Sequence, residues 1–155
     1  MDIDEYRRVI SEVVDIEIRD SSIVESRKTL LHLQERREIL LSMKSKIDKD
    51  IRQVEVDYLV RRTNIREEFS PENVGSSKMK KFFNNSRSPA TMRAKAMKHL
   101  ESERETKIDL YKDLKFTIDD LIEQIEDIMV EVYGSMKSFL GHSKKAEKVT
   151  EYQSK

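Results

Sequence analysis

Residues 98–140 read KHLESERETKIDLYKDLKFTIDDLIEQIEDIMVEVYGSMKSFL, and their apolar side chains recur in steps of three and four. The repeat has no charged interruption and consists of Tyr111, Leu114, Ile118, Leu121, Ile125, Ile128 and Val132. Alternating steps of three and four keep one face of a helix turned toward a partner helix. Because most intervening positions are charged, this helix cannot be buried on all sides. Another part of the chain must therefore supply its partner.

The composition favours a few long helices over a compact globule. Of 155 residues, 39% are charged and 6% are aromatic, and only three Gly and two Pro are present to form turns. The absence of Cys excludes disulfides and cysteine-ligated zinc. The acidic start lacks the positive charge of a signal peptide, and no apolar run approaches the roughly 20 residues that span a bilayer. We therefore expect a soluble, cytoplasmic protein without a membrane span.

The apolar periodicity and the residues typical of helix ends predict three helices, at residues 2–19, 23–69 and 89–140. Ser22 and Glu25 have the spacing of a capping box, which favours a new helix from residue 23, although one continuous helix through Ser22 is the alternative. Ser88 followed by Pro89 is typical of a helix start. Residues 70–88 are then a basic loop, and the polar residues 141–155 are expected to form a disordered tail.

The two long helices should fold back on each other across this loop. The predicted fold is therefore all-α: an elongated antiparallel two-helix coiled-coil hairpin, with the short N-terminal helix packed at its open end, in a single domain of residues 1–140. If the loop midpoint sets the register, facing residue numbers sum to about 157, as in an antiparallel coiled coil. That register predicts Arg37 opposite Asp119 and Asp120, and Lys44 opposite Asp113.

The last helix carries a second apolar line beside its main one, formed by Ile122, Met129, Tyr133, Met136 and Leu140. A contact between two helices uses one line, so the second line needs another partner. Either the first helix or a second copy of the chain could cover it. We expect a homodimer through this end, which is also rich in acidic residues.

No pattern of residues indicates catalysis or metal binding. His32, His99 and His142 are far apart, and none belongs to a metal-ligating spacing. Adjacent acids such as Asp119 and Asp120 diverge on a helix, and no Gly-rich phosphate loop is present. We therefore expect a protein that is not an enzyme and has no cofactor, metal or small-molecule substrate.

One segment stands out: residues 73–100 contain no Asp or Glu. The candidate site residues in this segment are Lys78, Lys80, Lys81, Phe82, Phe83, Arg87, Arg93, Lys95 and Lys98. Such a surface could contact an acidic protein, a membrane surface or the phosphates of a nucleic acid, or could simply keep a loop soluble. We interpret the chain as a coiled-coil interaction or scaffold protein that presents this basic, Phe-containing tip to a partner; nucleic-acid binding is the alternative.

Overall fold

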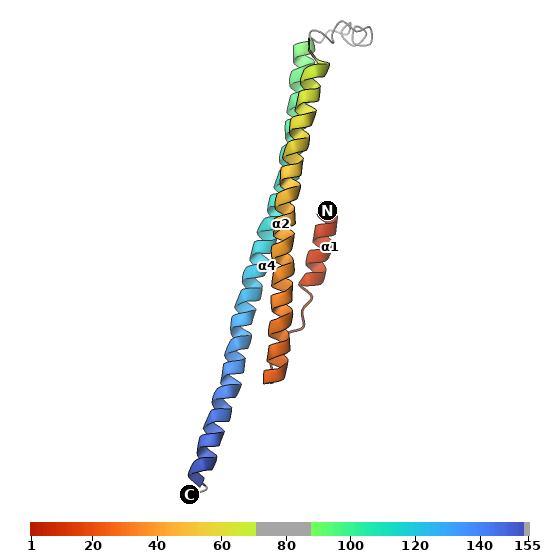
Figure 1. Cartoon of the computed structure of the whole chain (residues 1–155). Coiled ribbons are helices and arrows are strands. Elements are labelled where there is room, and N and C mark those ends of the chain that lie inside the picture. Colours follow the sequence, from red (N-terminus) through yellow and green to blue (C-terminus); the bar gives the residue numbers. More distant parts are fainter. Residues whose placement is uncertain (71–87, 154–155) are drawn as a thin grey trace. The chain divides into compact units, whose positions relative to one another are not determined.

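The described part of the chain contains three α-helices (Figure 1). The structure is a computed structural model that describes the backbone of residues 1–70 and 88–153 and the side chains of 1–70 and 88–141. α1 covers Ile3–Val13, α2 covers Ile23–Glu68 and α4 covers Pro89–Gln153. Unit 1 contains Met1–Ser45 and Leu114–Lys155, and unit 2 contains Lys46–Asp113. Whether residues 1–140 form a single domain stays a prediction.

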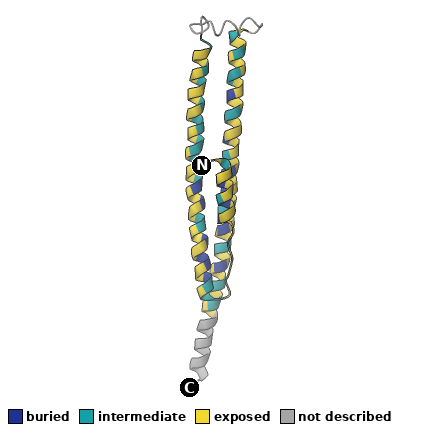
Figure 2. Ribbon diagram, turned by 90° about the vertical axis from the view of Figure 1, so that its right-hand side faces the viewer, coloured by how far each residue is buried: buried dark blue, intermediate teal, exposed yellow. Residues whose placement is uncertain are grey.

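Unit 1 has an apolar core along the predicted line of α4. Leu33 and Leu40 of α2 and Ile118 of α4 are fully buried, and Val132 is 1% exposed. The other buried apolar side chains of the two helices in unit 1 are Leu30, Met43, Leu114 and Ile125 (Figure 2). Four of the seven side chains in the three-four repeat, Leu114, Ile118, Ile125 and Val132, are thus excluded from water, as packing between two helices requires.

Ion pairs flank this core and show the direction of the two helices. Arg37 Nε lies 2.8 Å from Glu126 Oε1, and Lys44 Nζ lies 2.6 Å from Asp119 Oδ1. Because the higher residue on α2 pairs with the lower residue on α4, the helices are antiparallel in unit 1.

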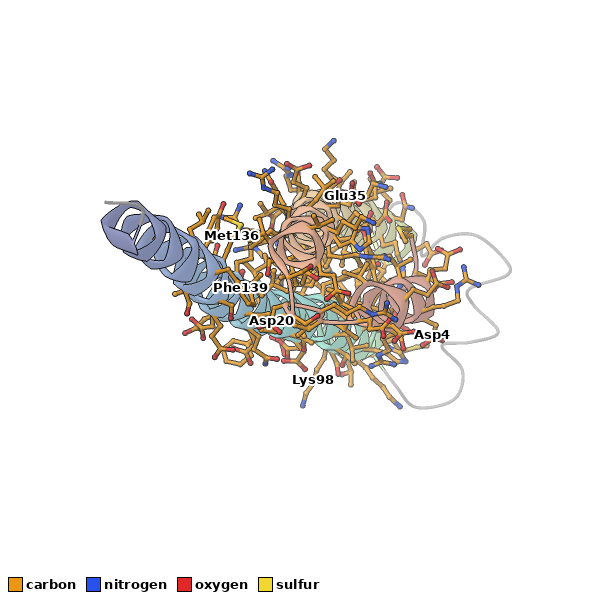
Figure 3. The ribbon with its side chains drawn as sticks, turned by 90° about the horizontal axis from the view of Figure 1, so that it is seen from below. Asp4, Asp20, Glu35, Lys98, Met136 and Phe139 are labelled. Atoms are coloured by element: carbon orange, nitrogen blue, oxygen red, sulfur yellow. The ribbon has the colours of Figure 1, made fainter. Side chains whose placement is uncertain are left out.

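α1 completes the core of unit 1 with Tyr6, Ile10 and Val13, which are buried on one face. It lies alongside α2 and to one side of the α2–α4 pair (Figures 1 and 3). A capping box starts the helix: the backbone N–H of Glu5 donates to Asp2 Oδ1, and the Asp2 N–H donates to Glu5 Oε2. The predicted packing of a short N-terminal helix on the hairpin is confirmed.

The first helix is shorter than predicted, because it ends at Val13 instead of residue 19. Residues 14–18 alternate apolar and charged side chains, a period that suits extended backbone better than helix. The hydroxyl of Thr29 on α2 holds this connection: it donates to the Arg19 carbonyl at 2.6 Å and accepts from the Arg19 N–H at 3.3 Å. Ser135 Oγ on α4 donates to Asp20 at 3.0 Å. The connection is therefore hydrogen-bonded to both long helices.

The predicted break before residue 23 is confirmed, with one difference at the cap. The N–H of Glu25 donates to Ser22 Oγ at 3.1 Å, as a capping box requires. The Glu25 carboxylate, however, accepts from the hydroxyl of Ser21 and not from the Ser22 backbone. Half of the predicted capping box is present.

Unit 2 has fewer buried apolar side chains among its described residues, namely Ile47, Leu100 and Ile108. Further along α2, the side chains of Ile51, Val54, Tyr58 and Ile65 are only half-buried. Arg61 of α2 pairs with Glu103 of α4 at 2.9 Å, and Glu55 pairs with Arg104 at 2.9 Å. The order of these pairs shows that the helices are antiparallel here too, which confirms the all-α antiparallel hairpin in each unit.

The predicted ion-pair partners in unit 1 are wrong. Arg37 pairs with Glu126 in place of Asp119 or Asp120, and Lys44 pairs with Asp119 in place of Asp113. Side chains on a helix lean toward its N-terminus. In an antiparallel pair, two long side chains that lean in this way meet at a point N-terminal to both of their own residues. Each partner in an ion pair therefore lies a few positions C-terminal to the residue that faces the other helix directly. Both errors have this direction.

The predicted tail is also wrong at its start, because α4 continues through Gly141 to Gln153. A single Gly inside a helix costs only about 1 kcal/mol relative to Ala. The residues that follow it include Lys144, Lys145, Ala146 and Glu147, which all favour helix. Their propensity is enough to carry the helix past the glycine. Within the described residues, no helix is apolar over a stretch long enough to cross a membrane.

Because only one of two neighbouring positions on α4 faces the core of unit 1, the same substitution should destabilise the protein strongly at that position and only slightly at the other. Ile118→Asp places a charge at a fully buried site and should lower the free energy of unfolding by about 4 kcal/mol or more. Phe116→Asp is the matched control, because Phe116 is 70% exposed; its effect should stay within about 1 kcal/mol. Thermal and urea melts measure both, and equal destabilisation would contradict the assignment of the buried face.

Candidate anion-binding surface

The helix that carries the described cations begins as the sequence predicts. Ser88 caps α4: its Oγ accepts from the Thr91 N–H at 3.2 Å, and Pro89 is the first helical residue. The first turn of α4 contains no acidic residue. The helix dipole and the cations that follow this turn give the beginning of α4 a positive potential.

The predicted tip residues fall into two groups. Lys78, Lys80, Lys81, Phe82, Phe83 and Arg87 lie outside the described residues. Arg93, Lys95 and Lys98 lie on α4 and are exposed (for Lys98, see Figure 3). No ion pair joins any of these three to another residue in the described ranges 1–70 and 88–141.

The structure separates Arg93 from the two lysines. Arg93 lines a largely apolar groove with Arg66, Phe69 and Met97. The lysines line another groove of unit 2, with a volume of about 840 Å³, which we call the basic groove. It is lined by Arg61, Lys95, Lys98, His99, Ser102, Glu103, Thr106 and Lys107.

The charges in the basic groove are unbalanced. Its single acidic side chain, Glu103, accepts from Arg61 Nη1 at 2.9 Å and lies 3.5 Å from His99 Nδ1. Lys95, Lys98 and Lys107 have no ion-pair partner among the described residues. Three ammonium groups thus face one groove whose only carboxylate is already paired. This arrangement attracts anions.

Hydroxyl groups lie among these cations. Ser102 and Thr106 are exposed on α4, and the Thr106 hydroxyl donates to the Ser102 carbonyl at 2.9 Å. Serine and threonine hydroxyls are common partners of phosphate oxygens. The Thr106 proton is already donated, so Ser102 is the hydroxyl that adds a hydrogen-bond donor to the charges of the groove.

A neighbouring cluster holds the two helices together beside the groove. Arg104 of α4 forms a bidentate pair with Glu55 of α2, with Nε–Oε2 at 2.9 Å and Nη2–Oε1 at 3.3 Å. The guanidinium also lies 4.8 Å from the centre of the Tyr58 ring, and the hydrogen bond to Glu55 raises the pKa of Arg104 above its ordinary value. A planar bidentate pair restricts orientation as well as distance. This cluster fixes the orientation of α4 relative to α2 beside the groove.

Two groove residues were not predicted as site residues from the sequence. Arg61 lies before the acid-free segment 73–100, and Lys107 lies beyond it. The helical spacing offered no signal for Lys107, because twelve residues are about three and a third turns and leave Lys107 about 120° around α4 from Lys95. Arg61 comes from the other helix, so only the packing of α2 on α4 reveals it.

Two of the three histidines have described side chains. His32 and His99 are both exposed, and they line different grooves. Across the described residues, no group of three His, Cys, Asp or Glu side chains is placed to hold a metal ion. Comparison of the chain with protein-family models, curated proteins and solved structures found no match.

Proposed function

We propose that the chain is a non-enzymatic helical-hairpin interaction module that presents a basic surface to an anionic partner. The observation that carries this proposal is the set of three unpaired lysines in the basic groove, Lys95, Lys98 and Lys107. The basic residues of the predicted tip, Lys78, Lys80, Lys81 and Arg87, would extend this surface, and Phe82 and Phe83 would add apolar contacts.

The distribution of charge supports a local electrostatic role. The chain has no net charge, but residues 46–113 contain 16 basic and 12 acidic residues, whereas the rest contains 14 and 18. Attraction to an anionic partner must therefore come from unit 2. Hydroxyls among the cations favour a phosphate-bearing partner, which makes nucleic-acid binding the second candidate function.

The proposal predicts that the protein binds to a cation exchanger, although its net charge gives no reason for it to bind. A chain with a pI of about 6.9 should pass through such a column at pH 8 unless a local basic surface binds it. We expect the wild-type protein to be retained at low salt and the variant K78E/K80E/K81E to elute earlier.

The matched control is K144E/K145E/K148E, which changes the net charge equally but on residues of unit 1. It should elute close to the wild type. If the wild type passed straight through, or if both triple variants shifted alike, the basic surface would not be the contact surface.

We further propose that the chain forms a homodimer through unit 1. On α4, Tyr133 and Leu140 are 48% and 46% exposed, and on α2 Val24 is 63% exposed. Tyr133 and Leu140 belong to the second apolar line of α4, whose remaining members, Ile122, Met129 and Met136, are half-buried. α1 therefore leaves part of this line open to a second copy.

Light scattering should show a particle of twice the chain mass of 18.4 kDa. The dimer should strengthen as salt rises, because the excess acidic charge of unit 1 repels its copy and salt screens that repulsion. Y133E/L140E should be monomeric, whereas Phe116→Glu, at another exposed apolar side chain of α4, should stay dimeric. A monomeric wild type at all salt concentrations would reject the dimer.

A further inference from the structure

The basic groove differs from an ordinary protein-binding surface in its lining. None of its eight lining residues is aliphatic, and none is Phe, Tyr or Trp. Protein–protein contacts depend on a few buried apolar or aromatic anchors at their centre. A groove of cations, hydroxyls and one histidine offers no such anchor to a protein, but it matches the groups that bind phosphate oxygens.

The cations are also spread along the helix instead of gathered around one point. Lys95 and Lys107 are twelve residues apart on α4, which corresponds to about 18 Å at 1.5 Å per residue. Lys98, Ser102 and Thr106 lie between them in sequence and also line the groove, with Lys98 and Lys107 on opposite edges of it because nine residues turn the helix by about 180°. A single phosphate ion would reach only some of these cations. A polymer with regularly spaced phosphates would use the whole length of the groove, since a duplex carries about one phosphate per 1.7 Å of its axis.

The residues that line the groove also favour binding of a double-stranded over a single-stranded nucleic acid. Proteins that bind single strands stack the bases on aromatic side chains. The groove lining has no Phe, Tyr or Trp, its one ring is the His99 imidazole, and Tyr58 elsewhere in unit 2 has the Arg104 guanidinium over its ring. Unpaired bases therefore gain little stacking from this groove, whereas the backbone of a duplex exposes its phosphates without needing a stacking surface.

We propose that the basic groove binds the phosphate backbone of a double-stranded nucleic acid, without reading its sequence. This inference rests on the proposed interaction function and names its partner. Arg61 and Glu103 hold each other across the groove, while Lys95, Lys98 and Lys107 contact phosphates. Glu101 and Glu105 are exposed on α4 outside the groove lining, and their negative charge limits the affinity.

Fluorescence anisotropy with a labelled duplex of about 20 base pairs, in two unrelated sequences, tests the proposal at low salt. The full chain should bind both duplexes equally and each more tightly than the corresponding single strands. With three lysines at phosphates, the logarithm of the affinity should fall with the logarithm of salt concentration at a slope of about −2.7.

The decisive variant is K95E/K98E/K107E, which should weaken duplex binding by about tenfold or more, since each lost phosphate contact removes counterion release. Its matched control is K46E/K49E/K112E. These three lysines are also exposed in unit 2 but do not line the groove, so the net charge of the unit changes equally. The control should retain most of the binding, and circular dichroism should show that both variants keep the helicity of the wild type.

Several results would overturn the proposal. These are no duplex binding at low salt, an equal loss in both triple variants, tighter binding to single strands, and equal binding to polyglutamate or to vesicles of anionic lipid. The cation-exchange result separates this inference from the function on which it rests. Retention on the exchanger without duplex binding would reject the nucleic acid and keep the interaction surface, whereas failure of both would reject the two together.

Discussion

The apolar contact between α2 and α4 in unit 1 is the interaction on which the rest of the structure depends. Leu33, Leu40 and Ile118 are fully buried there, and the charged side chains stay at the edges of the contact. Exposed ion pairs contribute about 1 kcal/mol at most, so the flanking pairs Arg37–Glu126 and Lys44–Asp119 select an alignment more than they stabilise it. The burial of apolar surface supplies the stability.

Unit 2 is built on a different balance of interactions. Its described core has three buried apolar side chains, and its polar contacts, such as the Arg104–Glu55 pair beside Tyr58, lie near the surface. Such contacts fix orientation but contribute little net free energy. The consequence is a division of roles within one hairpin. Unit 1 carries most of the core, whereas unit 2 carries the groove that we propose for binding.

The sequence predicted the helices and their buried faces well, because spacing along one helix is a local property. The repeat through Ile118 and Val132, the break before Ile23 and the cap at Ser88 follow from residues within one or two turns of each other. What the sequence did not predict depends on contacts between distant segments. The segment that follows the end of α1 at Val13 is held by hydrogen bonds between Arg19 and Thr29. The ion-pair partner of Arg37 depends on how side chains of α2 and α4 lean toward each other. The basic groove likewise needs Arg61 from α2 beside lysines of α4.

Hydrogen exchange along α4 tests the central claim, that apolar burial in unit 1 and not the ion-paired contact of unit 2 stabilises the hairpin. Amides within one continuous helix, away from its frayed ends, differ in protection chiefly because the packing around them differs. We predict that amides of residues 114–132 exchange about tenfold more slowly, or slower still, than those of residues 95–110. Equal exchange in the two segments, or slower exchange in residues 95–110, would contradict the account.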